Sequence, residues 1–133
     1  MTAIVLQAPV SRAQLWTGRV LTTIATLFLC FDAGIHIANP PFVVQASTQM
    51  GFPAQLMPDL GVIVVVSLAL YLWERTAFFG ALLLTAYLGG ATALQVRVGS
   101  PAFEVLFPAI FATLLWAGLV LRDRRVRALV TGS

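Results

Sequence analysis

Long apolar segments separated by short polar stretches dominate the pattern of this chain. The segments span about residues 15–38, 59–74, 76–96 and 104–121. The third has no formal charge over 21 residues, enough at ~1.5 Å per residue to cross a hydrocarbon core of ~30 Å. The second is uninterrupted only from Leu60 to Trp73, so we expect it to extend at both ends, through Pro58 and Glu74. The pattern predicts an all-α four-helix transmembrane bundle.

A shorter helix is expected between the first two spans, in residues 39–59. Asn39 is a suitable N-cap, and Pro40–Pro41 can open a helix. Gly51 is a suitable stop, and Pro53 prevents continuation. This helix is too short to span, so we predict that it lies at the membrane interface or folds over the mouth of the bundle.

Composition supports one integral membrane domain over residues 1–133. The chain is 59% hydrophobic and 10% charged, with a mean hydropathy of +0.93, whereas soluble domains are roughly 25% charged. All eight basic residues are arginines, and four spans put seven of them on the side of both termini and only Arg97 opposite. The bias predicts a multi-pass protein with cytoplasmic termini, in contact with the lipid bilayer. It explains the basic charge without nucleic acid as a partner.

Ionisable residues gather toward the predicted non-cytoplasmic end. Asp32 and His36 are four residues apart and therefore share one helix face. Asp59 and Glu104 stand near the starts of the second and fourth spans, where a helix-capping role and a site role both remain open. Asp32, His36 and Asp59 are the candidates for acid–base chemistry.

The third span carries a row of small residues that leads to Arg97. A row at helical spacing permits close helix packing and is expected to face into the bundle; its members are Ala86, Gly89, Gly90 and Ala93. Arg97 continues this row, so we expect it to pair with a carboxylate, first Asp32 and otherwise Glu104 or Asp59.

Two interpretations of the polar group remain open. One is an ion pair that only fixes the register of the helices. The other is a ligand pocket with apolar walls, near Phe31 and Phe103 and lined by Asp32, His36, Tyr87, Gln95, Arg97 and Glu104. One histidine and one cysteine make no recognised metal-ligand set, so no metal site and no intrinsic cofactor are expected. The residues leave open whether the protein is an enzyme.

Several stretches resemble the DoxX-like family of small bacterial membrane proteins. They run from "WTGRVLTTIATLFLCFDAGIHI" through "GALLLTAYLGGA" and "VRVG" to "WAGLVLRD", and the resemblance covers about residues 14–129. It implies a four-helix transmembrane bundle in the bacterial cytoplasmic (inner) membrane. Relatives often read "GGAVATHVRVG", with a histidine at the position of Gln95. A weaker similarity of architecture concerns the EXPERA group, whose carboxylates near the ends of the first two helices would correspond to Asp32 and Asp59.

The DoxX-like resemblance implies a subunit or accessory of a membrane redox or quinone-linked complex, with a quinone or another lipophilic molecule as ligand. Two alternatives stay open. The chain would act alone as an enzyme or binder for a terpenoid, sterol-like or quinone ligand. Otherwise it would be a purely structural assembly subunit, in contact with other membrane subunits or with further copies of itself.

Overall fold

The computed structural model describes residues 9–132, which form α-helices and one short 3₁₀ turn. The elements are α1 (Arg12–Ala38), α2 (Pro41–Gln49), η1 (Ala54–Leu56), α3 (Met57–Leu72), α4 (Ala77–Arg97), α5 (Ala102–Arg122) and α6 (Arg124–Thr131). Helices α1, α4 and α5, and η1 together with α3, are long and apolar enough to cross a membrane. The predicted all-α, four-helix membrane bundle is therefore confirmed.

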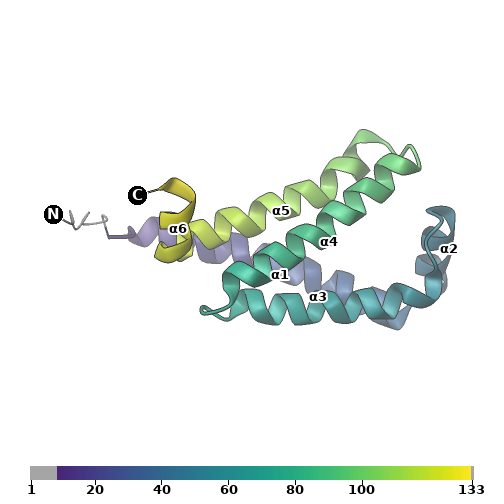
Figure 1. The fold of residues 1–133 in the computed structure, drawn as a ribbon, viewed down its shortest axis with the longest axis horizontal. Coiled ribbons are helices and arrows are strands. Elements are labelled where there is room, and N and C mark those ends of the chain that lie inside the picture. Colours follow the sequence, from purple (N-terminus) through teal and green to yellow (C-terminus); the bar gives the residue numbers. More distant parts are fainter. Residues whose placement is uncertain (1–8, 133) are drawn as a thin grey trace.

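The four long helices form a ring. Helix α1 packs against α3 and α5, and α4 packs against the same two neighbours, so α1 and α4 lie diagonally opposite. In Figure 1 the helices converge at the end that holds α6, the α3–α4 turn and the start of α1, called here the basic end. Toward the opposite end the α4–α5 pair diverges from the α1–α3 pair, and α2 stands at the ends of α1 and α3; this end is called here the α2 end.

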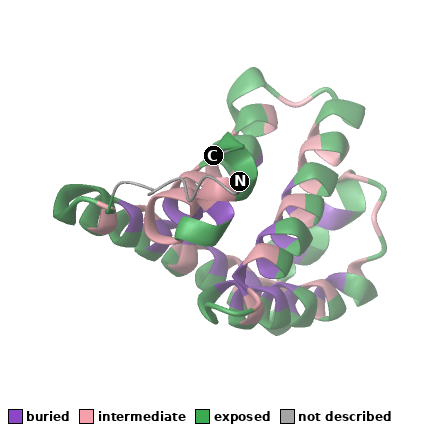
Figure 2. Cartoon of the chain, turned by 60° about the vertical axis from the view of Figure 1, so that its left-hand side comes forward, coloured by how far each residue is buried: buried purple, intermediate pink, exposed green. Residues whose placement is uncertain are grey.

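Glycines permit the close approach of helices near the basic end. A Cβ on Gly18 of α1 would lie 2.9 Å from the Cβ of Leu121, and one on Gly118 of α5 would lie 3.1 Å from the Gly18 carbonyl oxygen. Buried residues follow the faces where helices meet, while the outward faces are exposed (Figure 2). An exposed apolar exterior is what a bilayer requires, because lipid rather than water covers it.

Tyr71 ties α3 to α5 at the basic end. Its buried hydroxyl donates to the Leu115 carbonyl oxygen at 2.7 Å. Arg122 donates to the Tyr71 carbonyl oxygen at 2.9 Å, and its guanidinium carbon lies 4.9 Å from the centre of the Tyr71 ring. These contacts satisfy polar groups that lipid could not satisfy.

The second span differs from the prediction at its C-terminal end. It is lengthened at its N-terminus by η1, which begins at Ala54, but it ends at Leu72 and does not continue through Glu74. Trp73 is extended, with φ −88° and ψ 120°, and the Thr76 hydroxyl donates to the Leu70 carbonyl oxygen at 2.8 Å. The hydroxyl thus satisfies a terminal carbonyl that a further helical turn would have occupied.

The short helix between the first two spans is present as α2, but Asn39 does not cap it. Asn39 instead ends α1 in the left-handed conformation, with φ 49°, and Pro40 precedes α2. Asparagine tolerates this conformation better than most residues. Helix α6 was not predicted; Asp123 caps it by accepting from the backbone N–H of Arg125 at 2.8 Å.

The small-residue row of α4 was wrongly predicted to face into the bundle. Ala86, Gly89, Gly90 and Ala93 are all exposed. A Cβ added to either glycine would meet nothing within 4 Å. The inward face of α4 instead carries Gly80, Ala81, Leu84 and Leu88, and no residue after Leu88 on this helix is buried.

Candidate functional site

Asp32 and His36 lie on one face of α1, as their spacing predicts. Both side chains are largely buried. The His36 Nδ1 atom lies 2.6 Å from the Asp32 carbonyl oxygen and 3.6 Å from Asp32 Oδ1. Helix geometry brings the two side chains together, because residues four apart stand one turn above each other.

Tyr87 joins this pair from the diagonally opposite helix. Its hydroxyl donates to Asp32 Oδ2 at 2.6 Å, and its ring centre lies 6.4 Å from that of His36. Tyr87 also packs against the buried core, whose last member on α4 is the adjacent Leu88. We call Asp32, His36 and Tyr87 the Asp32 cluster; it contains three of the six residues predicted to line a pocket.

A row of phenylalanines leads to the Asp32 cluster along α5. Phe103, Phe107 and Phe111 are spaced by four residues, with ring centres 5.6 Å and 5.0 Å apart in succession. Phe28 of α1, one turn before Asp32, stacks on Phe111 at 3.9 Å. The i, i+4, i+8 spacing on α5 was a signal that sequence reasoning missed, whereas Phe31, which it named, is 66% exposed.

Arg97 is not the partner of Asp32. Its guanidinium lies over Gly51, with Nη2 3.5 Å from the position that a Cβ on Gly51 would take. Within residues 9–132 no carboxylate lies within 4 Å of Arg97, and the only contact of this kind between an acidic and a basic side chain is that of Asp32 with His36, so the predicted Arg97 pairing is wrong. The reason is geometric: the α4 face that carries Arg97 turns outward.

The remaining predicted residues lie outside the Asp32 cluster. Gln95 accepts a hydrogen bond from the Ser100 hydroxyl at 2.6 Å, within the α4–α5 connection. Asp59 and Glu104 are exposed in the first turns of α3 and α5, where a carboxylate stabilises the helix dipole. No described hydrogen bond or ion pair connects Asp59 or Glu104 with the cluster.

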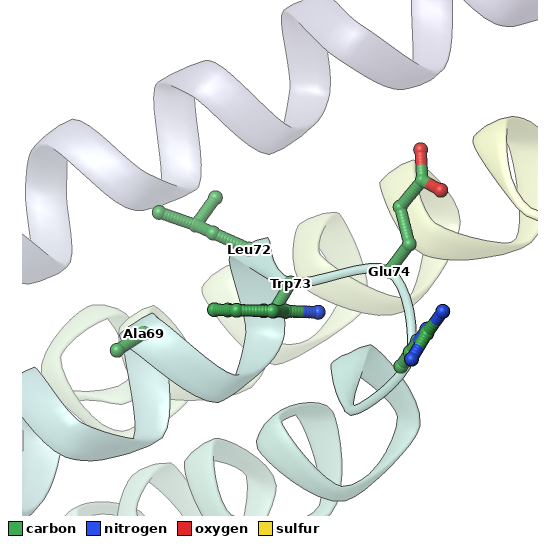
Figure 3. A pocket seen from close by; sticks show the side chains of 5 residues that line it. Ala69, Leu72, Trp73 and Glu74 are labelled. Atoms are coloured by element: carbon green, nitrogen blue, oxygen red, sulfur yellow. The ribbon is translucent and has the colours of Figure 1, made fainter.

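A surface hollow of about 470 Å³ lies at the basic end, lined by Ala69, Leu72, Trp73, Glu74 and Arg75. In Figure 3 the Trp73 ring lies beside Ala69, and Glu74 points away from it. The hollow is thus formed by the α3–α4 turn, far along α3 from the α2 end. It does not coincide with the pocket predicted around Asp32, which stays a prediction.

The part of the chain that the structure describes contains no evident metal-binding site. No three or more His, Cys, Asp or Glu side chains there come together as a metal site would require. The cluster therefore offers hydrogen bonding and proton-accepting groups, carried by one carboxylate, one imidazole and one phenol.

Comparison with known proteins supplies the family. No curated protein and no solved structure matches the chain. Residues 20–118 match the sequence profile of the DoxX-like family. This match covers most of the chain, including α3, α4 and the whole Asp32 cluster. The chain therefore belongs to the DoxX-like family.

Proposed function

We propose that this integral membrane protein is a subunit or accessory of a membrane redox or quinone-linked complex, and that it binds a lipophilic molecule at the Asp32 cluster. The observation that carries the proposal is the convergence of a carboxylate, an imidazole and a phenol inside the bundle. Asp32 lies six residues before the end of α1, about 9 Å along the helix axis.

The cost of placing these groups in a membrane span favours a functional site. An ionisable side chain at bilayer depth costs roughly 2.5–3.5 kcal/mol, and such residues commonly mark ligand or proton pathways. A link that only fixed α1 to α4 would need Asp32 and Tyr87, since their hydrogen bond joins the two helices. It would not need His36, whose ring adds a second polar group on the same face.

A quinone fits the surroundings of the cluster. Its flat ring matches the phenylalanine row, in which aromatic contacts run from exposed Phe103 to Phe28, one turn from Asp32. Its two oxygens, which carry protons in the reduced form, place polar groups at the two ends of the ring, as a site with a few polar side chains requires. When bound, a quinone supplies reversible transfer of electrons and protons.

The proposal includes further membrane subunits as partners. The exposed row that contains Gly89 and Gly90 on α4 supports this, because small residues allow another helix to approach closely. Placement in the bacterial inner membrane with cytoplasmic termini also belongs to the proposal. The start of α1, the α3–α4 turn and the end of α5 with α6, which carry seven of the eight arginines, lie at the basic end (Figure 1).

Purification in a mild detergent tests the proposal. We expect the protein to co-purify with quinone, counted as oxidised plus reduced forms after extraction, and with a stoichiometric partner protein. Asp32→Ala should lower the bound quinone at least fivefold, whereas the matched control Asp59→Ala, an exposed carboxylate outside the cluster, should not.

The outcomes separate the alternatives. A quinone or terpenoid bound to a lone chain would instead support a stand-alone enzyme or binder. A partner protein without any lipophilic ligand would support a purely structural subunit. Equal ligand content in the Asp32→Ala and Asp59→Ala proteins would reject the Asp32 cluster as the binding site.

A further inference from the structure

The hydrogen-bond donors of Tyr87 and His36 both donate to acceptors within the Asp32 cluster. The Tyr87 hydroxyl has one proton, which it donates to Asp32 Oδ2. The Asp32 carbonyl oxygen can only accept, so His36 Nδ1, at 2.6 Å from it, carries the proton of that hydrogen bond. Neither proton remains for a ligand.

The groups that remain open in the cluster are acceptors. With its proton on Nδ1, the neutral His36 ring has a lone pair on Nε2. Nε2 makes no hydrogen bond within the described residues, nor is it one of the four buried polar atoms there that lack a partner. It is therefore open to the surroundings. Asp32 Oδ1, 3.6 Å from Nδ1, is too far for a strong hydrogen bond and also keeps its lone pairs.

No cation among residues 9–132 satisfies these acceptors. Arg97, the only arginine toward the α2 end, lies over Gly51. The other seven arginines belong to the segments at the basic end. A carboxylate at membrane depth with a single side-chain donor is stabilised by any further donor that reaches it.

We infer that the Asp32 cluster binds lipophilic molecules through their hydroxyl groups, and so prefers the reduced, hydroxylated form of a quinone, the quinol, over the oxidised form. The inference rests on the proposed function, because it assigns the ligand class of the same site. A quinol offers O–H groups to His36 Nε2 and Asp32 Oδ1. A quinone offers only carbonyl oxygens, which make no hydrogen bond with these acceptors, so it binds less tightly.

The test compares decylubiquinol with decylubiquinone by calorimetric titration of the intact protein in detergent under anaerobic conditions. For the wild type we expect the quinol to bind about tenfold more tightly, the ratio given by one charge-assisted hydrogen bond. Asp32→Asn keeps the shape of the side chain but adds N–H donors, so the ratio should fall to about one or invert. Asp59→Asn, the matched control, should keep the tenfold ratio.

Tyr87→Phe provides a second test, which does not require the Asp32→Asn protein to fold. It removes a donor that already faces Asp32, so the preference for quinol should persist or grow. Equal affinities in the wild type, or tighter binding of the quinone, would overturn the inference while leaving the proposed site intact. Loss of the preference in Tyr87→Phe would also overturn it. Absence of binding by either form in the wild type would reject the proposed function itself.

Discussion

The most discriminating prediction concerns two glycines of the same helix, Gly80 and Gly90. The structure packs Gly80 against the backbone of α3: a Cβ there would overlap the Tyr71 nitrogen and lie 2.5 Å from its Cα and 2.8 Å from the Leu70 carbonyl carbon. Gly90, by contrast, has no atom within 4 Å of that position. Alanine at the two sites should therefore have opposite effects on stability.

The magnitude follows from these distances. The Gly80 Cβ and Tyr71 Cα would have to separate by about 0.9 Å to reach an ordinary contact of 3.4 Å. The obstacle is backbone, which moves only if α3 and α4 part. Overpacking of this kind costs about 1–3 kcal/mol, and the backbone contact places Gly80→Ala at the upper end. Better helix propensity returns at most about 1 kcal/mol, so we expect a net loss of about 2 kcal/mol. Gly90→Ala keeps only the propensity gain.

The measurement is the free energy of unfolding, obtained by titrating each purified variant in mild detergent with a denaturing detergent and following helicity. Gly80→Ala should unfold at a clearly lower denaturant fraction than the wild type, and Gly90→Ala at the same or a higher one. Unchanged stability of the Gly80→Ala protein would refute the packing of α4 on α3 described here. A loss in the Gly90→Ala protein as well would instead show that a helix of another subunit covers Gly90.

The remaining predictions concern the Asp32 cluster, Arg97 and topology. Tyr87→Phe and Asp32→Asn should show a coupling of about 0.6–1.7 kcal/mol in a double-mutant cycle of unfolding free energies. Additive losses would contradict the hydrogen bond between the two side chains. Arg97→Ala should change the unfolding free energy by no more than about 0.5 kcal/mol, because Arg97 has no ion pair among the described residues. A loss of several kcal/mol would show that Arg97 does form a buried ion pair. In a Cys30→Ser background, Val130→Cys should react with a membrane-impermeant thiol reagent only when the cytoplasmic face is accessible; labelling of intact cells would reverse the topology.

The membrane spans are predictable from the sequence because the bilayer selects for length and hydropathy directly. The lengths of α4 and α5, 21 residues each, match the apolar runs within a few positions. The end of α3 is not predictable in this way, since Trp73 is apolar like Leu72 and yet lies outside the helix. The hydroxyl of Thr76 donates to the Leu70 carbonyl oxygen, and the helix ends at Leu72.

The inward face of each helix is much harder to predict. In a soluble protein apolar residues mark the core, but here lipid-facing and core-facing positions are equally apolar. Small residues gave the wrong face on α4, where Gly90 is open while Gly80 lies against Tyr71. Whether a glycine meets a neighbouring backbone depends on the rotation of two helices relative to each other. A single sequence does not specify that rotation. The Arg97 prediction failed for the same reason, because it assumed the rotation that Gly90 implied.

The position of the Asp32 cluster within the bundle explains how it can be both ordered and accessible. Tyr87 is adjacent to Leu88, the last buried residue of α4, so its ring is held by the packed core. Beyond this level α4 has no buried residue, and the helices diverge toward α2 (Figure 1). Asp32 thus lies at the level where the buried face of α4 ends and the α4–α5 pair separates from the α1–α3 pair. The proposed site needs fixed side chains on one side and a route of entry on the other. The close packing at Gly18, Gly80 and Gly118 supplies the first of these at a distance from the Asp32 cluster.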